Sequence, residues 1–211
     1  MKISYKISVI LIGVASTIVM LGFNLPILII YPSILLLFLL ILFLPQFYTV
    51  YKSNNLKRIE RFLEENKRKP IFAYVLAIKT GDTEKIIEAI QAILHKHKNR
   101  YLQEVYKTNL AYYENNVSKI EQLAKQISKE PLRTYNIAYV EVLKGNFEDA
   151  RRLKENLPTG WMPYAIEAII ANEQGDIEAF QNEAKNSIEH ARGIQKFSLL
   201  YSFEHMERNI K

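Results

Sequence analysis

The chain of 211 residues contains no cysteine. This absence excludes disulfides, thiolate metal sites, nucleophilic thiols and lipid attachment through a cysteine. Acidic residues are also missing from residues 1–52, which hold three lysines, whereas residues 53–69 hold six basic and three acidic residues and residues 70–211 hold nineteen of each. The net charge of +6 is therefore confined to the N-terminal third. A nucleic-acid-binding protein, which carries its basic surface on the folded domain, is not expected.

Local signatures of enzyme chemistry are also missing. The three aspartates, Asp82, Asp149 and Asp176, lie in or just after probable turns, where helix capping accounts for them. His95 and His97 are two residues apart, so on a helix their side chains point in different directions and do not share a metal ion unless the segment unwinds. No phosphate-binding loop, HExxH or GxSxG motif occurs. We expect no catalytic residue, metal site, cofactor or small-molecule substrate, and hence no enzyme.

Two uncharged apolar runs dominate the N-terminal domain, residues 1–52, and cover residues 7–23 and 27–44. Each reaches about 26 Å as a helix, close to the thickness of a hydrocarbon core. Gly22, Asn24 and Pro26 supply turn residues between them, so the pattern predicts a two-helix transmembrane hairpin. A cleaved signal peptide is the alternative for the first run, but no small-x-small cleavage site follows it.

The end of the second span is left open by two prolines. Pro32 either kinks the helix or lies in its first turn, which would move its end past Pro45 toward Val50. Lysines precede the first run and basic residues follow the second, so the positive-inside rule places both termini in the cytoplasm of a multi-pass inner-membrane protein. Neither span contains an ionisable group of the kind that transport paths use, so a pump or carrier is not expected.

Residues 53–69 are predicted to form a basic amphipathic connecting helix, because apolar residues recur at helical spacing among lysines and arginines. Its functional interpretation is adhesion to the anionic lipid bilayer, worth about 1 kcal/mol per basic residue near the surface. An ordinary topology determinant with a solvated face explains the same charges, and both can hold. The candidate membrane-surface residues are Lys52, Lys57, Arg58 and Arg61.

Residues 70–211 show helical periodicity throughout and no strand alternation, so an all-α domain is predicted. Four turn pairs recur at intervals of 34, 30 and 30 residues: Gly81-Asp82, Asn115-Asn116, Gly145-Asn146 and Gly175-Asp176. The first residue of each pair suits the left-handed end of one helix and the second can cap the next. The helices after the turns carry apolar stripes: Ile86, Ile90, Ile93, Leu94; Val117, Ile120, Ala124, Ile127; Phe147, Ala150, Leu153, Leu157; Ile177, Phe180, Ala184, Ile188.

This helix-turn-helix repetition resembles the tetratricopeptide (TPR) family over about residues 70–191. The resembling units are AYVLAIKTGDTEKIIEAI, TNLAYYENNVSKIEQLAKQI, YNIAYVEVLKGNFEDARRLK and IEAIIANEQGDIEAFQNEAK. In the third, Gly145, Asn146, Phe147 and Ala150 stand where the family pattern has a glycine, a polar residue, an aromatic and a small residue. The resemblance implies an α-solenoid of about four helical hairpins. Ile194, Phe197, Leu200 and Tyr201 mark a C-terminal capping helix.

The resemblance also implies a binding face on the first helix of each unit, which the family uses for extended peptides or partner helices. Tyrosine contributes a large rigid ring with a hydroxyl group, and asparagine pairs with a peptide backbone. The candidate partner-binding residues are Tyr106, Asn109, Tyr113, Tyr135, Asn136, Tyr139 and Asn172. Packing between helices is the competing explanation for the tyrosines.

The expected function is that of a membrane-anchored, non-enzymatic scaffold that docks a protein or peptide partner. The alternative is an accessory subunit of a membrane enzyme or transporter, which would contact it through the transmembrane hairpin. Nucleic-acid binding is disfavoured, although Lys96, Lys98 and Arg100 leave a local basic patch.

Overall fold

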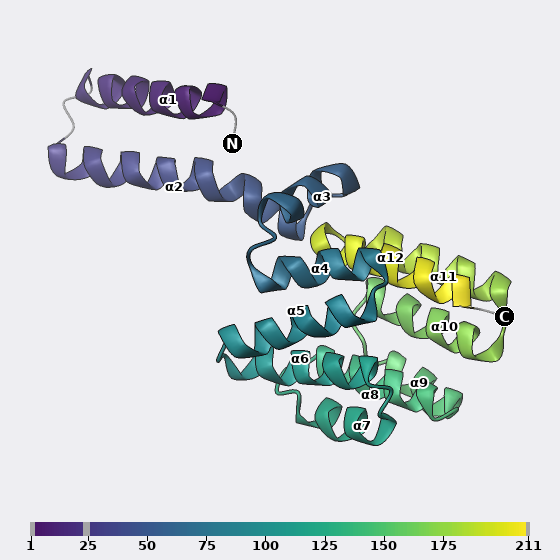
Figure 1. Cartoon of the computed structure of the whole chain (residues 1–211). Helices are drawn as coiled ribbons and strands as arrows, with labels where there is room; N and C mark the ends of the chain where they lie inside the picture. Colours follow the sequence, from purple (N-terminus) through teal and green to yellow (C-terminus); the bar gives the residue numbers. More distant parts are fainter. Residues whose placement is uncertain (1–2, 23–25, 210–211) are drawn as a thin grey trace. The chain divides into compact units, whose positions relative to one another are not determined.

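The structure, a computed structural model, describes residues 3–22 and 26–209. Over these residues the protein is all-helical, with twelve helices and no strand. The helices are α1 (Ile3–Gly22), α2 (Ile27–Tyr51), α3 (Leu56–Glu65), α4 (Pro70–Thr80), α5 (Thr83–Lys96), α6 (Arg100–Tyr113), α7 (Val117–Gln126), α8 (Leu132–Leu143), α9 (Phe147–Lys154), α10 (Trp161–Gln174), α11 (Ile177–His190) and α12 (Gly193–Asn209). Figure 1 shows them along the chain. They form two compact units, Met1–Lys52 and Ser53–Lys211.

The N-terminal unit consists of α1 and α2, which contact each other. The predicted turn residue Asn24 lies outside the described residues. Helix α2 is 25 residues long, or about 37 Å, and most of its large apolar side chains are exposed, as for Leu28 at 88%. Among the described residues, Leu28–Tyr51 is the one helix long and apolar enough to cross a membrane, whereas α1 contributes the shorter apolar stretch Leu11–Met20. The first span of the hairpin, which falls on α1, and hence the hairpin as a whole, therefore remain predictions.

Helix α2 contains both prolines and continues past the predicted end at residue 44. Pro32 and Pro45 each lack an N–H, yet neither ends the helix. Near its C-terminal end, the Gln46 amide donates to the Leu42 carbonyl at 3.1 Å and the Thr49 hydroxyl donates to the Pro45 carbonyl at 2.7 Å.

The C-terminal unit is built from neighbouring helices that pack in pairs: α4 with α5, α6 with α7, α8 with α9, and α10 with α11. The turns between them follow the predicted chemistry. Gly81, Asn115, Gly145 and Gly175 have left-handed backbones, with φ of 68°, 52°, 80° and 73°. Only glycine and asparagine adopt this conformation at low cost.

The helix caps after these turns are confirmed in three units. Asp82, Asn116 and Asp176 accept the backbone N–H of the residue three positions on, at 3.2, 3.0 and 3.0 Å. In the third unit the prediction is wrong. The Asn146 side chain does not cap α9 and instead donates to the Glu141 carboxylate at 2.7 Å.

The apolar stripes form the core of the unit. All their members are buried or partly buried except Ile177, which is 50% exposed because it is the first residue of α11. Ile90 and Ile93 are fully enclosed, and burial of such a side chain contributes about 1.5–3 kcal/mol. The stripe on α5 therefore sets which face of this helix meets α4 and α6.

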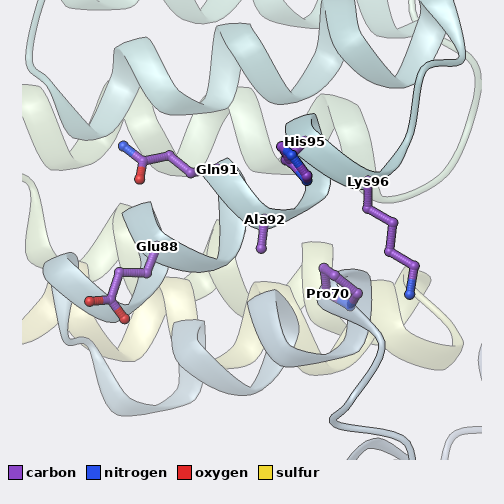
Figure 2. A pocket seen from close by; sticks show the side chains of 6 residues that line it. All are labelled: Pro70, Glu88, Gln91, Ala92, His95 and Lys96. Carbon is purple, nitrogen blue, oxygen red and sulfur yellow. The ribbon is translucent and has the colours of Figure 1, made fainter.

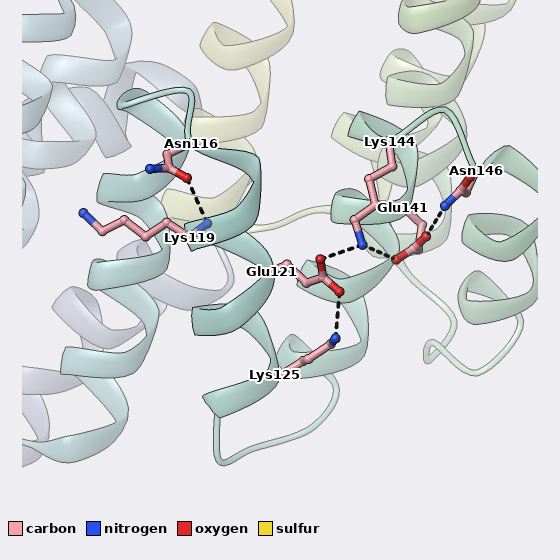
Figure 3. Close-up of polar contacts among 7 residues, drawn as sticks. All are labelled: Asn116, Lys119, Glu121, Lys125, Glu141, Lys144 and Asn146. Carbon is pink, nitrogen blue, oxygen red and sulfur yellow. Dashed lines mark hydrogen bonds and ion pairs between the residues drawn. The ribbon is translucent and has the colours of Figure 1, made fainter.

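An ionic network joins α7 to α8 at the surface (Figure 3). The Glu121 carboxylate pairs with Lys125 on its own helix and with Lys144 from the end of α8, each at 2.7 Å. Lys144 also pairs with Glu141 at 3.2 Å. These two lysines hold the pKa of Glu121 at about 2, because their hydrogen bonds favour the ionised carboxylate. The network fixes the register of α7 against α8.

Helix α12 does more than cap the last pair. It packs on α11 and also on α3 and α4, so the array of helix pairs returns to its beginning (Figure 1). Phe197 is fully buried with Ile59, Leu63 and Val75. His205 Nε2 lies 3.0 Å from the Ile78 carbonyl oxygen and therefore donates to it. The predicted capping helix thus links the two ends of the unit.

Candidate functional site

Three of the predicted partner-binding residues gather on α6 around a tyrosine of α4. The rings of Tyr106 and Tyr74 meet edge to face at 5.4 Å between centroids. The Asn109 amide donates to the Tyr74 hydroxyl at 3.4 Å, and Tyr113 packs against the same apolar cluster as Tyr74 and Tyr106. This cluster lies where the first helices of two successive pairs meet.

Burial moves the ionisation of these phenols to more alkaline pH. Desolvation raises the pKa of Tyr74 well above 10, and the neighbouring Tyr113 and Tyr106 raise it further. Desolvation alone raises the pKa of Tyr106 to about 12. A neutral phenol donates and accepts hydrogen bonds without carrying charge. The cluster therefore offers polar but uncharged groups at every physiological pH.

The α8 residues form a second cluster with α6. Tyr139 stacks on Tyr112 at 4.6 Å between centroids, and the Tyr112 hydroxyl donates to the Asn136 carbonyl at 3.3 Å. The Asn136 side chain is only 6% exposed and donates to the Leu132 carbonyl at 2.7 Å. Its amide group is therefore engaged inside the unit, whereas part of the Tyr139 ring remains accessible.

The two clusters are close enough to interact electrostatically. Desolvation raises the pKa of Tyr139 to about 12, and charges on Glu173 and Tyr113 add to this effect. Glu173 comes from α10, Tyr139 from α8 and Tyr113 from α6.

The remaining two predicted residues are placed differently. Tyr135 meets the Trp161 ring at 5.2 Å in an edge-to-face contact between α8 and α10, and burial raises its pKa. Asn172 is partly buried near the end of α10. No side-chain hydrogen bond joins Asn172 to the tyrosines within the described part of the chain, so the structure does not bring it into either cluster.

Sequence analysis missed three aromatic residues at the centre of these contacts: Tyr74, Tyr112 and Trp161. Tyr74 lies on α4, the first helix of the first repeat, for which no partner-binding residue was predicted. Tyr112 and Trp161 adjoin the chosen positions along their helices, but no spacing rule shows which side of a helix faces its neighbour. An aromatic residue on every first helix was the available signal.

The basic residues predicted to face the membrane surface are exposed. Lys57, Arg58 and Arg61 lie on α3, and Lys52 lies at the end of the N-terminal unit. Helix α3 buries Ile59 and Leu63 on its opposite face. Residues 56–65 are therefore an integral helix of the C-terminal unit, with a buried apolar face and an exposed face that carries both basic and acidic residues.

A hollow of about 760 Å³ in the C-terminal unit lies beside α5 (Figure 2). Its lining residues are Pro70, Glu88, Gln91, Ala92, His95 and Lys96. A second hollow of about 420 Å³ lies among α9, α10 and α11. Its two basic residues are both paired, because Glu167 contacts Lys154 and Arg151. Among the described residues, no three side chains of the metal-binding types come together.

Exposed apolar surface is confined to the other unit. Of the large apolar side chains that the structure describes in the C-terminal unit, Ile177 alone is exposed. The chemistry available for recognition on the C-terminal unit is therefore polar: partly exposed tyrosines, amides and basic side chains.

Comparisons of the chain with protein-family models, with curated proteins and with solved structures find no match.

Proposed function

We propose that the protein is a membrane-anchored, non-enzymatic scaffold that docks a protein or peptide partner on its helical C-terminal unit. In this proposal α1 and α2 form a two-span hairpin in the inner membrane, and both termini lie in the cytoplasm. The observation that carries the proposal is the apolar surface of α2, which has no counterpart on the C-terminal unit. Anchoring confines the docking surface to the membrane and raises its encounter rate with membrane-bound clients.

The pairwise packing of helices supports a TPR-like solenoid as the docking domain. In this reading the partner contacts the accessible parts of Tyr106, Asn109, Tyr113 and Tyr139. Their rings contribute apolar contact area and their hydroxyl groups accept or donate hydrogen bonds. Because large apolar side chains are scarce on this surface, we expect a partner segment that is itself polar or aromatic rather than aliphatic.

Membrane anchoring is tested by flotation of the full-length protein with liposomes, followed by alkaline extraction. We expect the protein to float and to resist extraction. Extraction would transfer the apolar 24-residue segment Leu28–Tyr51 of α2 from the bilayer into water, which is unfavourable. Protease added outside intact cells should leave the C-terminal unit whole. Full release by alkali, or digestion from outside, would contradict the proposal.

Docking is tested by photo-crosslinking in intact cells from a photoreactive residue at position 113. A specific adduct is expected. For the variant Y106F/Y113F/Y139F the crosslinker is placed at position 172, and its adduct should be weaker than the adduct from position 172 in the chain with all three tyrosines. Replacement by phenylalanine keeps the rings that pack between helices and removes only the hydroxyl groups. Y164F is the matched control, because the Tyr164 ring contacts His190 outside both clusters. Equal adduct in all variants would contradict docking through these phenols.

A second candidate function is that of an accessory subunit, which contacts a membrane enzyme or transporter through the hairpin. The space around Gly13 favours it, since no atom lies within 4 Å of an added Cβ there and a partner helix could approach closely. Replacing α1 and α2 with an unrelated hairpin separates the two functions. A tethered scaffold should keep its activity, whereas an intramembrane subunit should lose it.

A further inference from the structure

The start of α4 and the end of α5 both line the hollow beside α5. Residues 66–69 lead into α4, and residues 97–99 follow α5. Because α4 and α5 pack as a pair joined by a short turn, the start of α4 lies beside the end of α5. Pro70 and Lys96 accordingly line the same hollow (Figure 2). We call the exposed surface of residues 66–70 and 95–100 the basic rim.

The basic rim carries a concentrated positive charge. Its basic residues, all exposed, are Lys67, Arg68, Lys69, Lys96, Lys98 and Arg100. Neither segment contains an acidic residue. Two of the six are paired, Lys67 with Glu64 at 3.3 Å and Arg100 with Glu104 at 2.8 Å.

The other four basic residues have no carboxylate partner within the described residues, and Lys69 lies over the Phe72 ring. Glu88 is the one acidic residue that lines the hollow. Residues 70–211 are neutral as a whole, so this excess is local. An excess of unpaired, exposed positive charge around a hollow attracts anions with several oxygen atoms.

We propose that the basic rim binds the phosphate-bearing headgroups of anionic lipids in the membrane that holds α2. This inference rests on the anchoring part of the proposed function. Ser53 follows directly on the N-terminal unit, and Lys67 lies within about 50 Å of it even along a fully extended chain. An anionic bilayer surface is therefore always within reach of the rim, at a high effective concentration.

The charge distribution favours a lipid surface over a nucleic acid. Non-specific binding to a nucleic acid needs a series of basic residues that follows its backbone. Here the unpaired charges gather at one end of one helix pair, and the remaining surface balances its charges. A lipid headgroup layer needs only such a local cluster, and each basic residue near it strengthens attachment about fivefold.

The test uses the full-length protein in nanodiscs, with one fluorescent label. Because the chain has no cysteine, Gln91→Cys introduces a single thiol in the hollow, at an exposed and uncharged position. The probe is a nitroxide on the headgroup of a tracer lipid, in discs of phosphatidylcholine alone or of an equal mixture with phosphatidylglycerol. We expect strong quenching of the label in the anionic discs, weak quenching in the neutral discs, and loss of the difference in molar salt.

Charge reversal provides the matched comparison. The variant R68E/K96E/K98E should lower the lipid-bound population about a hundredfold or more, and quenching should fall to the level of neutral discs. K107E/K185E/R208E changes the net charge equally at exposed positions outside the rim and should leave quenching unchanged. A second label at Gln174→Cys reports the background, because this exposed residue lies beside the other hollow.

Two results would overturn the inference. One is equal quenching at position 91 in neutral and anionic discs. The other is a label that is insensitive to lipid but responds to an added single-stranded oligonucleotide or polyglutamate, which would make another polyanion the occupant. Failure of the proposed function looks different, because a protein that is not anchored does not remain with the discs at all.

Discussion

Gly81 is the residue at which backbone conformation and long-range packing are most tightly coupled. It ends α4 with a φ of 68°, and a Cβ added there would lie 2.6 Å from the His205 ring. We predict that Gly81→Ala destabilises the C-terminal unit by more than the roughly 1–2 kcal/mol expected for a side chain in left-handed geometry. The excess arises because the imidazole must move away from the Ile78 and Lys79 carbonyls. Urea unfolding followed by Trp161 fluorescence measures the loss.

Gly145→Ala is the matched control for this prediction. Its φ is 80°, but no atom lies within 4 Å of the added Cβ, so only the backbone cost applies. His205→Ala in the Gly81→Ala background should recover part of the loss, because it removes the clash. Equal destabilisation by the two glycine variants would mean that the His205 contact contributes nothing.

At the scale of elements, Glu121 joins α7 to α8. Its pKa is lowered to about 2 by Lys125 and Lys144, so the folded state holds a carboxylate that the unfolded chain protonates near pH 4.5. The stabilisation is complete above pH 4.5 and is lost as the pH falls toward 2. We predict that Glu121→Gln lowers the urea midpoint at pH 7 and that the difference from the natural protein shrinks toward pH 2.

Glu148→Gln is the comparison for Glu121→Gln. Glu148 pairs with Arg151 within α9 at 3.0 Å, and its side chain is 86% exposed, so this pair joins no two helices. Exposed pairs of this kind contribute little. A pH-independent loss in Glu121→Gln, or an equal effect in both variants, would contradict a bridging role.

Helix α12 is the element that connects the ends of the C-terminal unit. We predict that Phe197→Ala costs about 3–5 kcal/mol and exposes the amides of α3 and α4 to hydrogen exchange, because this ring fills the space between Ile59, Leu63 and Val75. Ile166→Ala is a control of similar cost in the core shared by α8 and α10. It should leave exchange in α3 unchanged. Continued protection of α3 in Phe197→Ala would show that α12 does not hold it.

Local elements were predictable because their causes are local. Left-handed glycines and asparagines end helices, and the apolar stripes on the second helices pack inward, so the paired arrangement follows from spacing alone. The contact of His205 with Ile78 spans 127 residues and has no local signal. The same holds for the inclusion of Tyr74 in the α6 cluster. Helix α2 continues through Pro45 to Tyr51, which is the longer of the two ends that its prolines left open.

At the scale of the whole molecule, the tyrosines couple folding to alkaline pH. Desolvation raises the pKa of Tyr74, Tyr112 and Tyr139 in the folded C-terminal unit, whereas the unfolded chain ionises near pH 10. The unfolded state therefore binds fewer protons above pH 10, so the free energy of unfolding falls as the pH rises toward 12. We predict that part of the tyrosinate absorbance at 295 nm of the full-length protein appears in a late phase above pH 10, together with unfolding.

The late phase of the titration reports the packing of the aromatic clusters. In concentrated urea this phase should move down toward pH 10, because the unfolded chain no longer desolvates the rings. Tyr106→Phe should remove one phenol from the late phase only, since burial raises the pKa of Tyr106 to about 12. A single phase near pH 10 without urea would mean that solvent reaches these rings freely. The scaffold would then present a flexible aromatic surface, whereas the contacts of Tyr106 with Tyr74 and of Tyr139 with Tyr112 describe a preformed one that a partner meets without further ordering of its rings.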